Sequence, residues 1–192
     1  DDRFSQHGGV DYVSVLRAAM TNVVSGTQQG AGTITMQVAR NFFLTREKTL
    51  TRKLREVLLA WKIEANLGKD EILELYVNQI FLGQRAYGFA AASQIYFGKP
   101  MNQLSVAETA MLAGLPQNPY YANPVANFER ATQRQRVVLQ RMHVVGVIND
   151  AQLAAARNEK IALRTPGQTS VDAAHVAEMA RQAVVDRFGT EA

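Results

Sequence analysis

The sequence predicts a mainly α-helical protein. Apolar residues recur at helical spacing along most of the 192 residues, whereas the apolar–polar alternation of strands is rare. Helix boundary signals also occur: Ser105 and Glu108 have the spacing of a capping box, and Gly68 follows a helical stretch at the position of a helix C-terminus. Since 47% of the residues are hydrophobic, the chain is able to bury the core of one large domain, or of one domain with an appendage.

Four helices are expected in the N-terminal half of the chain. They cover residues 11–24, 33–44, 45–65 and 69–78. A Gly-rich polar loop over residues 25–32 separates the first two helices, and Thr33 is placed to cap the second. The fourth helix is expected to stop around Gly83.

The C-terminal half begins with an Ala-rich segment and continues with further helices. They cover residues 105–115, 128–145, 150–158 and 176–188. Glu108 is interpreted as the cap of the first of these helices rather than as a catalytic residue. Residues 116–124 form an irregular connection, and residues 165–170 have the composition of a linker. We therefore expect one domain over residues 1–160, followed by a linker and one helix over residues 161–192.

Positive charge is concentrated in one segment. Residues 40–62 contain seven basic and two acidic side chains, so this segment carries a net charge of +5 in a chain whose total is +4. A local cationic site on a nearly neutral body favours an anionic ligand. The chain has no cysteine, which excludes disulfides, thiol catalysis and zinc–thiolate sites, and the three histidines do not have the spacing of metal ligands.

The helix expected over residues 45–65 is the centre of this cationic segment. Its apolar residues are Leu50, Leu54, Val57, Leu58, Trp61 and Ala65. At about 100° per residue, Arg52 and Glu56 point away from this apolar stripe and Lys53 lies on its flank. Two interpretations are open at this point. The three residues form either a solvated face with an ion pair of about 0.2–0.5 kcal/mol, or part of a site for an anion.

Five stretches of the chain carry recognisable motifs, and they occur in a fixed order. They are residues 1–9, 30–41, 52–56, 69–83 and 134–139. For example, residues 52–56 fit Arg-Lys-x-x-Glu, and residues 69–78 fit Lys-x-x-Ile-Leu-Glu-x-Tyr-x-Asn. The ordered set resembles the peptidoglycan glycosyltransferases, the polymerase modules of bifunctional class A penicillin-binding proteins. Residues 172–189 look like the connector that leads to a transpeptidase domain in the 1A type.

The resemblance implies a lysozyme-like, two-lobed helical domain with a substrate cleft between the lobes and a C-terminal helical connector. It also implies a reaction. The 4-hydroxyl of lipid II attacks the anomeric carbon of the growing chain with inversion, forms a β-1,4 linkage and expels the lipid pyrophosphate. Cations must gather where the leaving group accumulates charge, and arginine suits phosphate oxygens. The implied substrate-binding residues are Arg40, Lys48, Arg52, Lys53 and Arg55, with Gln37 and Thr33.

The catalytic base is the exception in this chain. In the family it is the glutamate that opens the first motif, which falls one position before Asp1. Asp1 matches the second acidic residue of that motif. Glu56 matches the second family carboxylate and is the catalytic candidate within the chain, where it orients Arg52 or helps to hold a divalent ion. We therefore expect little or no polymerase activity from a chain that starts at Asp1.

Other positions support the site or depart from the family pattern. Gly32 stands where the family usually has Ser, Met36 where it has the first Gln of a pair, and Gln135 where it has a second Arg. Each change alters the hydrogen-bonding groups of the implied site. The supporting residues are Asp1, Phe4, His7, Tyr76 and Asn78. Phe4 and His7 are expected to be a core aromatic and a buried histidine, and Tyr76 and Asn78 to brace the helix of the cationic site from inside.

The apolar faces near residues 12–24 and 42–44 have two open interpretations. They form core, or they dip into the membrane in which the lipid substrate resides. The resemblance implies a location at the extracytoplasmic face of the inner membrane. No apolar run approaches the ~18 residues that span a bilayer, so the transmembrane anchor is expected outside this chain.

Two other functions are carried as alternatives. A lysozyme or lytic transglycosylase module would also use a carboxylate in a helical cleft, but it has no use for a phosphate-binding cluster. A non-catalytic module for nucleic acid or anionic lipid would need cations along an extended track, whereas here they centre on one segment. We therefore expect no nucleic acid partner. No cofactor is required by the sequence, and Mg²⁺ or Mn²⁺ is plausible beside a pyrophosphate.

Overall fold

A computed structural model describes residues 3–26, 30, 32–43 and 50–164. Within these ranges the protein contains eight α-helices and three short 3-10 helices, and its only β-type pairing is an isolated bridge between Phe81 and Tyr87. The α-helices are α1 (Tyr12–Ser25), α2 (Ile34–Phe43), α3 (Leu50–Glu64), α4 (Lys69–Gln79), α5 (Phe89–Phe97), α6 (Val106–Gly114), α7 (Phe128–Val144) and α8 (Asp150–Asn158). The 3-10 helices are η1 (Phe4–Gln6), η2 (Met101–Gln103) and η3 (Leu115–Gln117). The predicted mainly α-helical class is confirmed.

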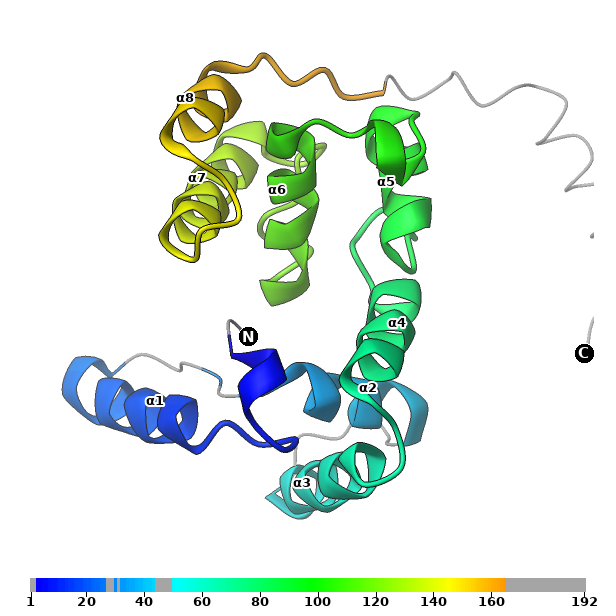
Figure 1. Cartoon of the computed structure of the whole chain (residues 1–192), viewed down its shortest axis with the longest axis vertical. Helices are drawn as coiled ribbons and strands as arrows, with labels where there is room; N and C mark the ends of the chain where they lie inside the picture. The colour runs from blue at the N-terminus through cyan, green and yellow to red at the C-terminus, as the bar shows by residue number, and fades with distance from the viewer. Residues whose placement is uncertain (1–2, 27–29, 31, 44–49, 165–192) are drawn as a thin grey trace, which may run out of the picture.

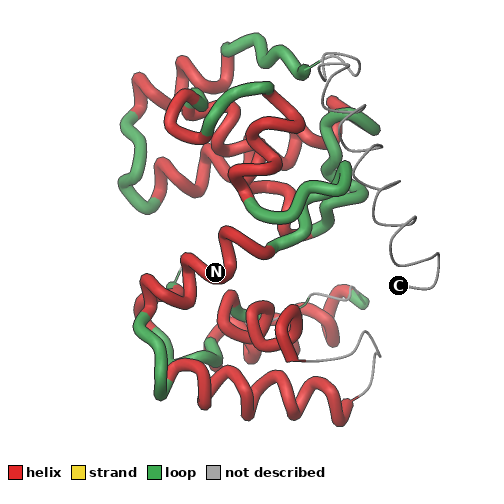
Figure 2. Tube along the Cα trace, turned by 90° about the vertical axis from the view of Figure 1, so that its right-hand side faces the viewer, coloured by secondary structure: helices red, strands yellow, loops and turns green. Residues whose placement is uncertain are grey.

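The helices form two lobes (Figure 1). The lower lobe contains α1, α2 and α3, the upper lobe contains α5 to α8, and α4 runs between them. The view turned by 90° shows the same division, with the N-terminal segment between the two groups of helices (Figure 2). The predicted two-lobed architecture is therefore confirmed, and the N-terminal motif lies where the lobes face each other.

Small side chains hold the upper lobe together. Ala107 and Ala110 of α6 are fully buried against Leu139 of α7 and Leu153 of α8, which lets these helices approach closely. A second apolar cluster begins at Leu112 and runs through α5 into α4 and α2. This cluster crosses between the lobes, so α4 is anchored at both of its ends by apolar packing.

The connection between α4 and α5 is a tight turn that only glycine accommodates at two positions. Gly83 has φ of +82°, and a Cβ on it would lie 2.8 Å from the Tyr96 hydroxyl oxygen. Gly88 has φ of +81° and packs against the carbonyl oxygen of Asn78. The buried Tyr96 hydroxyl donates a hydrogen bond of 2.8 Å to the carbonyl of Leu82. The turn is thus fixed from beneath by α5.

The sequence patterns did not identify α5 as a helix. Its residues are mostly small or aromatic and are apolar on all sides, so no helical stripe stands out, and only an Ala-rich segment could be noted. Thr33 and the capping box at Ser105 were predicted correctly as helix starts. The helix expected over residues 176–188 lies outside the described residues.

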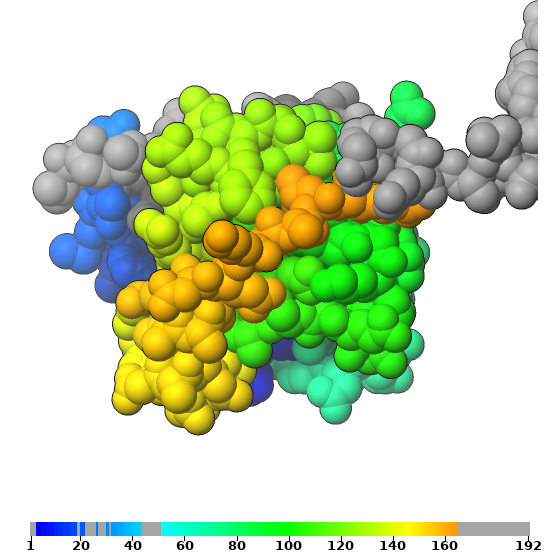
Figure 3. Space-filling view, turned by 90° about the horizontal axis from the view of Figure 1, so that it is seen from above, coloured from blue at the N-terminus to red at the C-terminus, as the bar shows by residue number. Residues whose placement is uncertain are grey.

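Residues 159–164 extend the domain beyond the last described helix. They cross the top of the upper lobe from α8 towards α5, drawn in orange in Figure 3. Ile161 and Leu163 pack against the apolar core, and the Arg164 amide donates to the carbonyl of Tyr96 at 2.8 Å. Residues 161–164 are therefore packed on the domain, and the predicted boundary at residue 160 stays a prediction.

The orientation of α3 is the feature that sequence periodicity left open. Leu54, Leu58 and Trp61 are 60%, 52% and 45% exposed, whereas Glu56 is 2% exposed. Ala60, on the same side as Glu56, packs with Val10 and Met36. Val57 of the predicted apolar stripe also packs inward, against Ala60, whereas Leu54, Leu58 and Trp61 of that stripe face outward. The arc of Arg52 and Glu56 faces the body of the lobe. The interpretation of Arg52–Glu56 as a solvated pair is therefore wrong.

Replacing Tyr96 by Phe tests the role of the α4–α5 turn. The change removes a buried hydrogen bond and leaves the Leu82 carbonyl without its partner, which costs about 1–3 kcal/mol. Chemical denaturation is expected to show this loss in the free energy of unfolding. Tyr120→Phe is the matched control, because the Tyr120 side chain is 76% exposed. Equal stability of the two variants would contradict this assignment.

Candidate active site

The candidate site is centred on one buried carboxylate in α3. The guanidinium of Arg52 donates to Oε1 of Glu56, and Nζ of Lys53 donates to Oε2 at 3.0 Å. The side chains of Glu56 and Arg52 are 3% and 18% exposed, whereas that of Lys53 is 49% exposed. Both oxygens of Glu56 are therefore engaged by cations, and the three residues together carry a net positive charge. We call them the α3 cluster.

The N-terminal end of α2 lies beside the α3 cluster. A Cβ on Gly32 would lie 3.8 Å from Nζ of Lys53. The next residue, Thr33, caps α2 by accepting from the Met36 amide at 3.2 Å, and it donates to the carbonyl of Gly9 at 2.6 Å. The hydroxyl of Thr33 is thus used structurally, and its predicted contact with substrate stays a prediction. Gly32 keeps open the space in which a family serine would face Lys53.

Of the other predicted cations, Arg40 and Arg55 lie in the described residues and both are exposed. Arg40 is exposed near the C-terminal end of α2, about 9 Å along the helix from Ile34, its first residue, at 1.5 Å per residue. Its charge lowers the pKa of Tyr76, although burial is the larger effect and raises that pKa to about 12. Arg55 is exposed on α3. Lys48 and Asp1 lie outside the described residues.

The remaining predicted residues have different surroundings from one another. Gln37 is partly buried on α2, and Tyr76 is buried in the core that links the lobes. Asn78 was expected to point inward, and this is wrong, because its side chain is exposed. Its backbone carbonyl supports the turn instead, since Gly88 packs directly against it.

A second charged network ties the N-terminal segment to the lower lobe. Nζ of Lys69 donates to Oε1 of Glu64 at 2.7 Å and to the carbonyl of His7 at 2.6 Å, and it lies 4.5 Å from the centre of the Phe4 ring. The hydroxyl of Thr35 donates to the same Glu64 oxygen at 2.6 Å. This network joins η1, α2, α3 and α4, and it fixes the part of the chain that carries the first motif.

Phe4 and His7 act as supports in this network. Phe4 packs against the core, as predicted, and its ring meets that of His7 edge to face at 6.4 Å. His7 is partly rather than fully buried. Burial lowers its pKa, and the nearby Lys69 charge lowers it further. The sequence patterns assigned no role to Lys69, Glu64 or Thr35, because the residues that meet here come from separate helices.

The described residues include no group of three or more His, Asp or Glu side chains that could hold a metal ion. At the α3 cluster, both oxygens of the single carboxylate already accept from cations. The donor set therefore does not fit a metal site made by protein side chains. Across the described ranges, no helix is both long and apolar enough to cross a bilayer.

Comparison with known proteins defines the class. The family model described as Transglycosylase matches residues 1–143. The chain belongs to the transglycosylase family. A crystal structure of penicillin-binding protein 1A from Haemophilus influenzae aligns with a TM-score of 0.53 and 36% identity, over 82% of this chain and 20% of that one. The lysozyme-like helical fold is thereby confirmed.

Comparison with related sequences identifies the type of transglycosylase domain more closely. It is 54% identical over 194 residues to penicillin-binding protein 1A of Neisseria meningitidis and 51% identical over 194 residues to that of Pseudomonas aeruginosa. In both comparisons it is matched along 100% of its length and spans 24% of the relative. A protein of Cupriavidus necator named as a transglycosylase is 57% identical over 164 residues, which cover 85% of this chain and 71% of that relative. The chain is thus a transglycosylase domain homologous to those of penicillin-binding proteins 1A.

Lowering the pH tests how the segment before α1 is held. Asp11 caps α1, and the hydrogen bond from the Ser14 hydroxyl, helped by Arg3 at 2.6 and 2.7 Å, lowers the pKa of Asp11 to about 2. This stabilisation is complete above the ordinary pKa of 3.8 and is lost as the pH falls from about 4 to 2. We expect the midpoint temperature of thermal unfolding to fall as the pH is lowered from about 4 to 2, and to fall less steeply in the Asp11→Asn variant. An equal dependence of the midpoint on pH in the two proteins would contradict the stabilising role of Asp11.

Proposed function

We propose that this domain polymerises lipid II into β-1,4-linked glycan strands by inverting glycosyl transfer, with the lipid pyrophosphate as leaving group. The observation that carries the proposal is the α3 cluster, a buried carboxylate that fixes two cations in a chain of the transglycosylase family. The bond from the anomeric carbon to the pyrophosphate oxygen breaks as the bond from the acceptor 4-hydroxyl forms. Negative charge therefore builds up on the pyrophosphate.

The α3 cluster matches the needs of that leaving group. Arg52 is held by Glu56, so its fork is oriented before the substrate arrives, and preorganised charge is more effective than mobile charge. Lys53 is half exposed and able to reach an incoming phosphate while it stays near Glu56. The cluster is net positive, and an anion would neutralise it.

Glu56 acts in this proposal as a positioning residue rather than as the base. Both of its oxygens already accept from cations, which leaves it poorly placed to remove a proton from a hydroxyl group. The base is the glutamate that the family motif places one position before Asp1. A divalent ion, if used, would be held mainly by the pyrophosphate, since Glu56 is the single acidic residue of the cluster.

The lower lobe presents a surface suited to a membrane. Large apolar side chains are exposed on three of its helices, and each is at least 45% exposed: Tyr12, Val13, Leu16, Met20, Phe42, Phe43, Leu54, Leu58 and Trp61. Exposed apolar side chains in such number indicate an interaction surface. We propose that the lower lobe rests on the extracytoplasmic face of the inner membrane, where its lipid-linked substrate resides. A transpeptidase domain and a transmembrane anchor would belong to the rest of the protein.

Polymerisation of lipid II tests the function directly. The chain is expressed with a glutamate placed before Asp1, and glycan product is separated by gel electrophoresis. Removing one preorganised donor to developing charge typically costs 10²–10³ in rate, so Arg52→Ala is expected to lose about 100-fold or more of the activity. Glu56→Gln is expected to lower the activity through Arg52.

The matched control is Lys62→Ala, because Lys62 is an exposed cation on the same helix. It should retain normal activity. Cleavage of finished glycan without polymer formation would instead favour a lytic enzyme. Tight binding of DNA without polymer formation would favour an anion-binding module.

Binding to liposomes tests the membrane face. Phe43→Asp places a charge on an exposed apolar surface of the lower lobe, where Phe43 is 63% exposed. We expect it to release the protein from vesicles in a flotation assay, since burying a charge in the acyl region is costly. Val147→Asp is the control, because Val147 is 65% exposed on the upper lobe. If both variants floated like the parent protein, the assignment of this surface would fail.

A further inference from the structure

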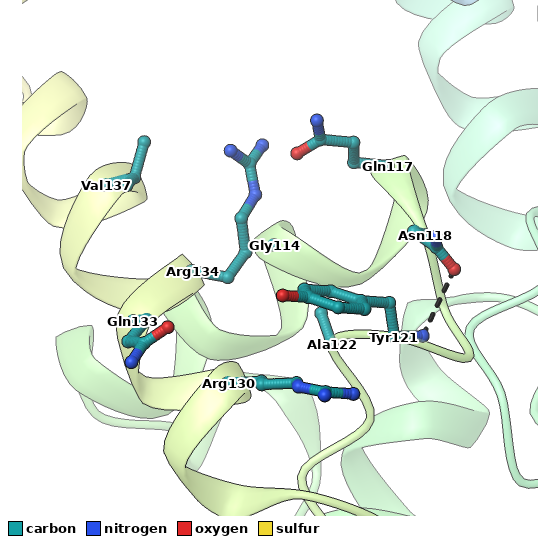
Figure 4. A pocket seen from close by; sticks show the side chains of 9 residues that line it. All are labelled: Gly114, Gln117, Asn118, Tyr121, Ala122, Arg130, Gln133, Arg134 and Val137. Atoms are coloured by element: carbon teal, nitrogen blue, oxygen red, sulfur yellow. Dashed lines mark hydrogen bonds between the residues drawn. The ribbon is translucent and has the colours of Figure 1, made fainter. Parts of the chain in front are cut away.

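The upper lobe contains a hollow of about 430 Å³ that the proposed reaction does not use. It lies between the start of α7 and the end of α6, and we call it the Arg134 hollow (Figure 4). Its polar lining residues are Gln117, Asn118, Tyr121, Arg130, Gln133 and Arg134. The volume falls within the range of small-molecule sites. Arg134 opens the fifth motif, to which the implied chemistry assigned no role.

Arg134 is a charge with no counter-ion in the described part of the chain. Its aliphatic stem lies over Gly114, where a Cβ would come within 2.8 Å of the Arg134 Cγ. Its Nε is buried and has no hydrogen-bond partner among the described residues. Burial lowers the pKa of this guanidinium, yet arginine stays charged in proteins. The buried Nε–H is a donor without an acceptor among the described residues, and a bound anion would supply that acceptor.

The walls of the hollow match a monoanionic ligand with an apolar body. None of the lining residues named by the structure is acidic. The guanidinium of Arg134 and the amide of Gln117 face each other across the opening (Figure 4). Below them lies the ring of Tyr121, with the Arg130 guanidinium stacked on it 4.6 Å from the ring centre. Ala122 and Val137 complete an apolar wall.

We propose that the Arg134 hollow binds the carboxylate end of a short peptide, with Arg134 as the anion-binding residue. The carboxylate accepts from the Arg134 fork and the Gln117 amide, while the peptide body lies on the Tyr121 ring and Val137. Arg134 is the guanidinium whose Nε has no partner among the described residues, whereas that of Arg130 is stacked on the Tyr121 ring, so Arg134 is the group assigned to the carboxylate.

Peptidoglycan supplies such ligands, because its glycan strands carry peptides. This source rests on the proposed function, whereas the binding site itself does not. The hollow would then hold a side peptide of the substrate or product while the sugar backbone reacts elsewhere.

A titration by NMR in the full chain tests the proposal. The probe is acetyl-Ala-Ala-Ala with a free carboxylate, and the same peptide with an amidated C-terminus is the ligand control. We expect the free carboxylate to shift the Arg134 Nε–H resonance and the amide to leave it unmoved. Arg134→Met keeps the stem over Gly114, and it is expected to weaken binding about tenfold or more through loss of a charge-assisted contact.

Arg136→Met is the matched protein control, because Arg136 is an exposed arginine on the same helix that does not line the Arg134 hollow. It should bind the peptide normally. If Arg134→Met unfolds, Gln117→Ala replaces it, since Gln117 is exposed and faces Arg134. Equal binding of acid and amide, or unchanged binding in these variants, would overturn the proposal. So would Arg134-dependent binding to phosphatidylglycerol vesicles without peptide binding. Polymerisation of lipid II is measured in a separate assay. An absence of polymerisation would therefore contradict the proposed function and not the peptide-binding site.

Discussion

The buried carboxylate of Glu56 determines how the lower lobe is built. A carboxylate that is 2% exposed is unfavourable unless cations meet both of its oxygens, and Arg52 and Lys53 do so from the preceding turn of the same helix. Because that arc of α3 faces inward, Leu54, Leu58 and Trp61 of the apolar stripe face outward. The polar site and the exposed apolar side chains of α3 therefore have one cause. Removing one partner from such a buried pair costs about 3–5 kcal/mol, so the arrangement also bears on folding.

The two lobes differ in the contacts that stabilise them: apolar packing dominates in the upper lobe, and polar contacts contribute more in the lower lobe. In the upper lobe, alanines on α6 and α8 bring helices together through an apolar core. In the lower lobe the described buried cluster is small, with Val10, Met36 and Ala60 at its centre. Ion pairs at Glu56 and Glu64 supplement it, and the Glu64 network also connects segments that are distant in sequence. A polar framework of this kind fixes orientation, which is what the proposed pyrophosphate site requires.

The sequence was sufficient for the helical class, for most helix boundaries and for the central triad of Arg52, Lys53 and Glu56. These features depend on spacing within one helix or on local capping, and both are visible in a linear pattern. The side of α3 that is buried was not predictable, since periodicity separates two arcs without saying which one meets the body. The Lys69–Glu64–Thr35 network was missed for the same reason, because its members meet only after three helices are packed. Arg40 shares the cationic segment with Glu56 but lies at the other end of α2.

The outward stripe of α3 also predicts how its positions tolerate change. Leu54, Leu58 and Trp61 are 45–60% exposed, so apolar residues of different shapes should be interchangeable there. On the opposite side, α3 packs closely on Gly9. A Cβ on Gly9 would lie 3.1 Å from the backbone of Ala60, so a larger residue at position 9 would have to displace its neighbours by tenths of an ångström. One helix is thus subject to two substitution rules. Side chains on its outer face are limited by the surroundings to which they are exposed, and those on its inner face are limited by their volume. Sequence variation among relatives should therefore differ between the outer and inner faces of α3.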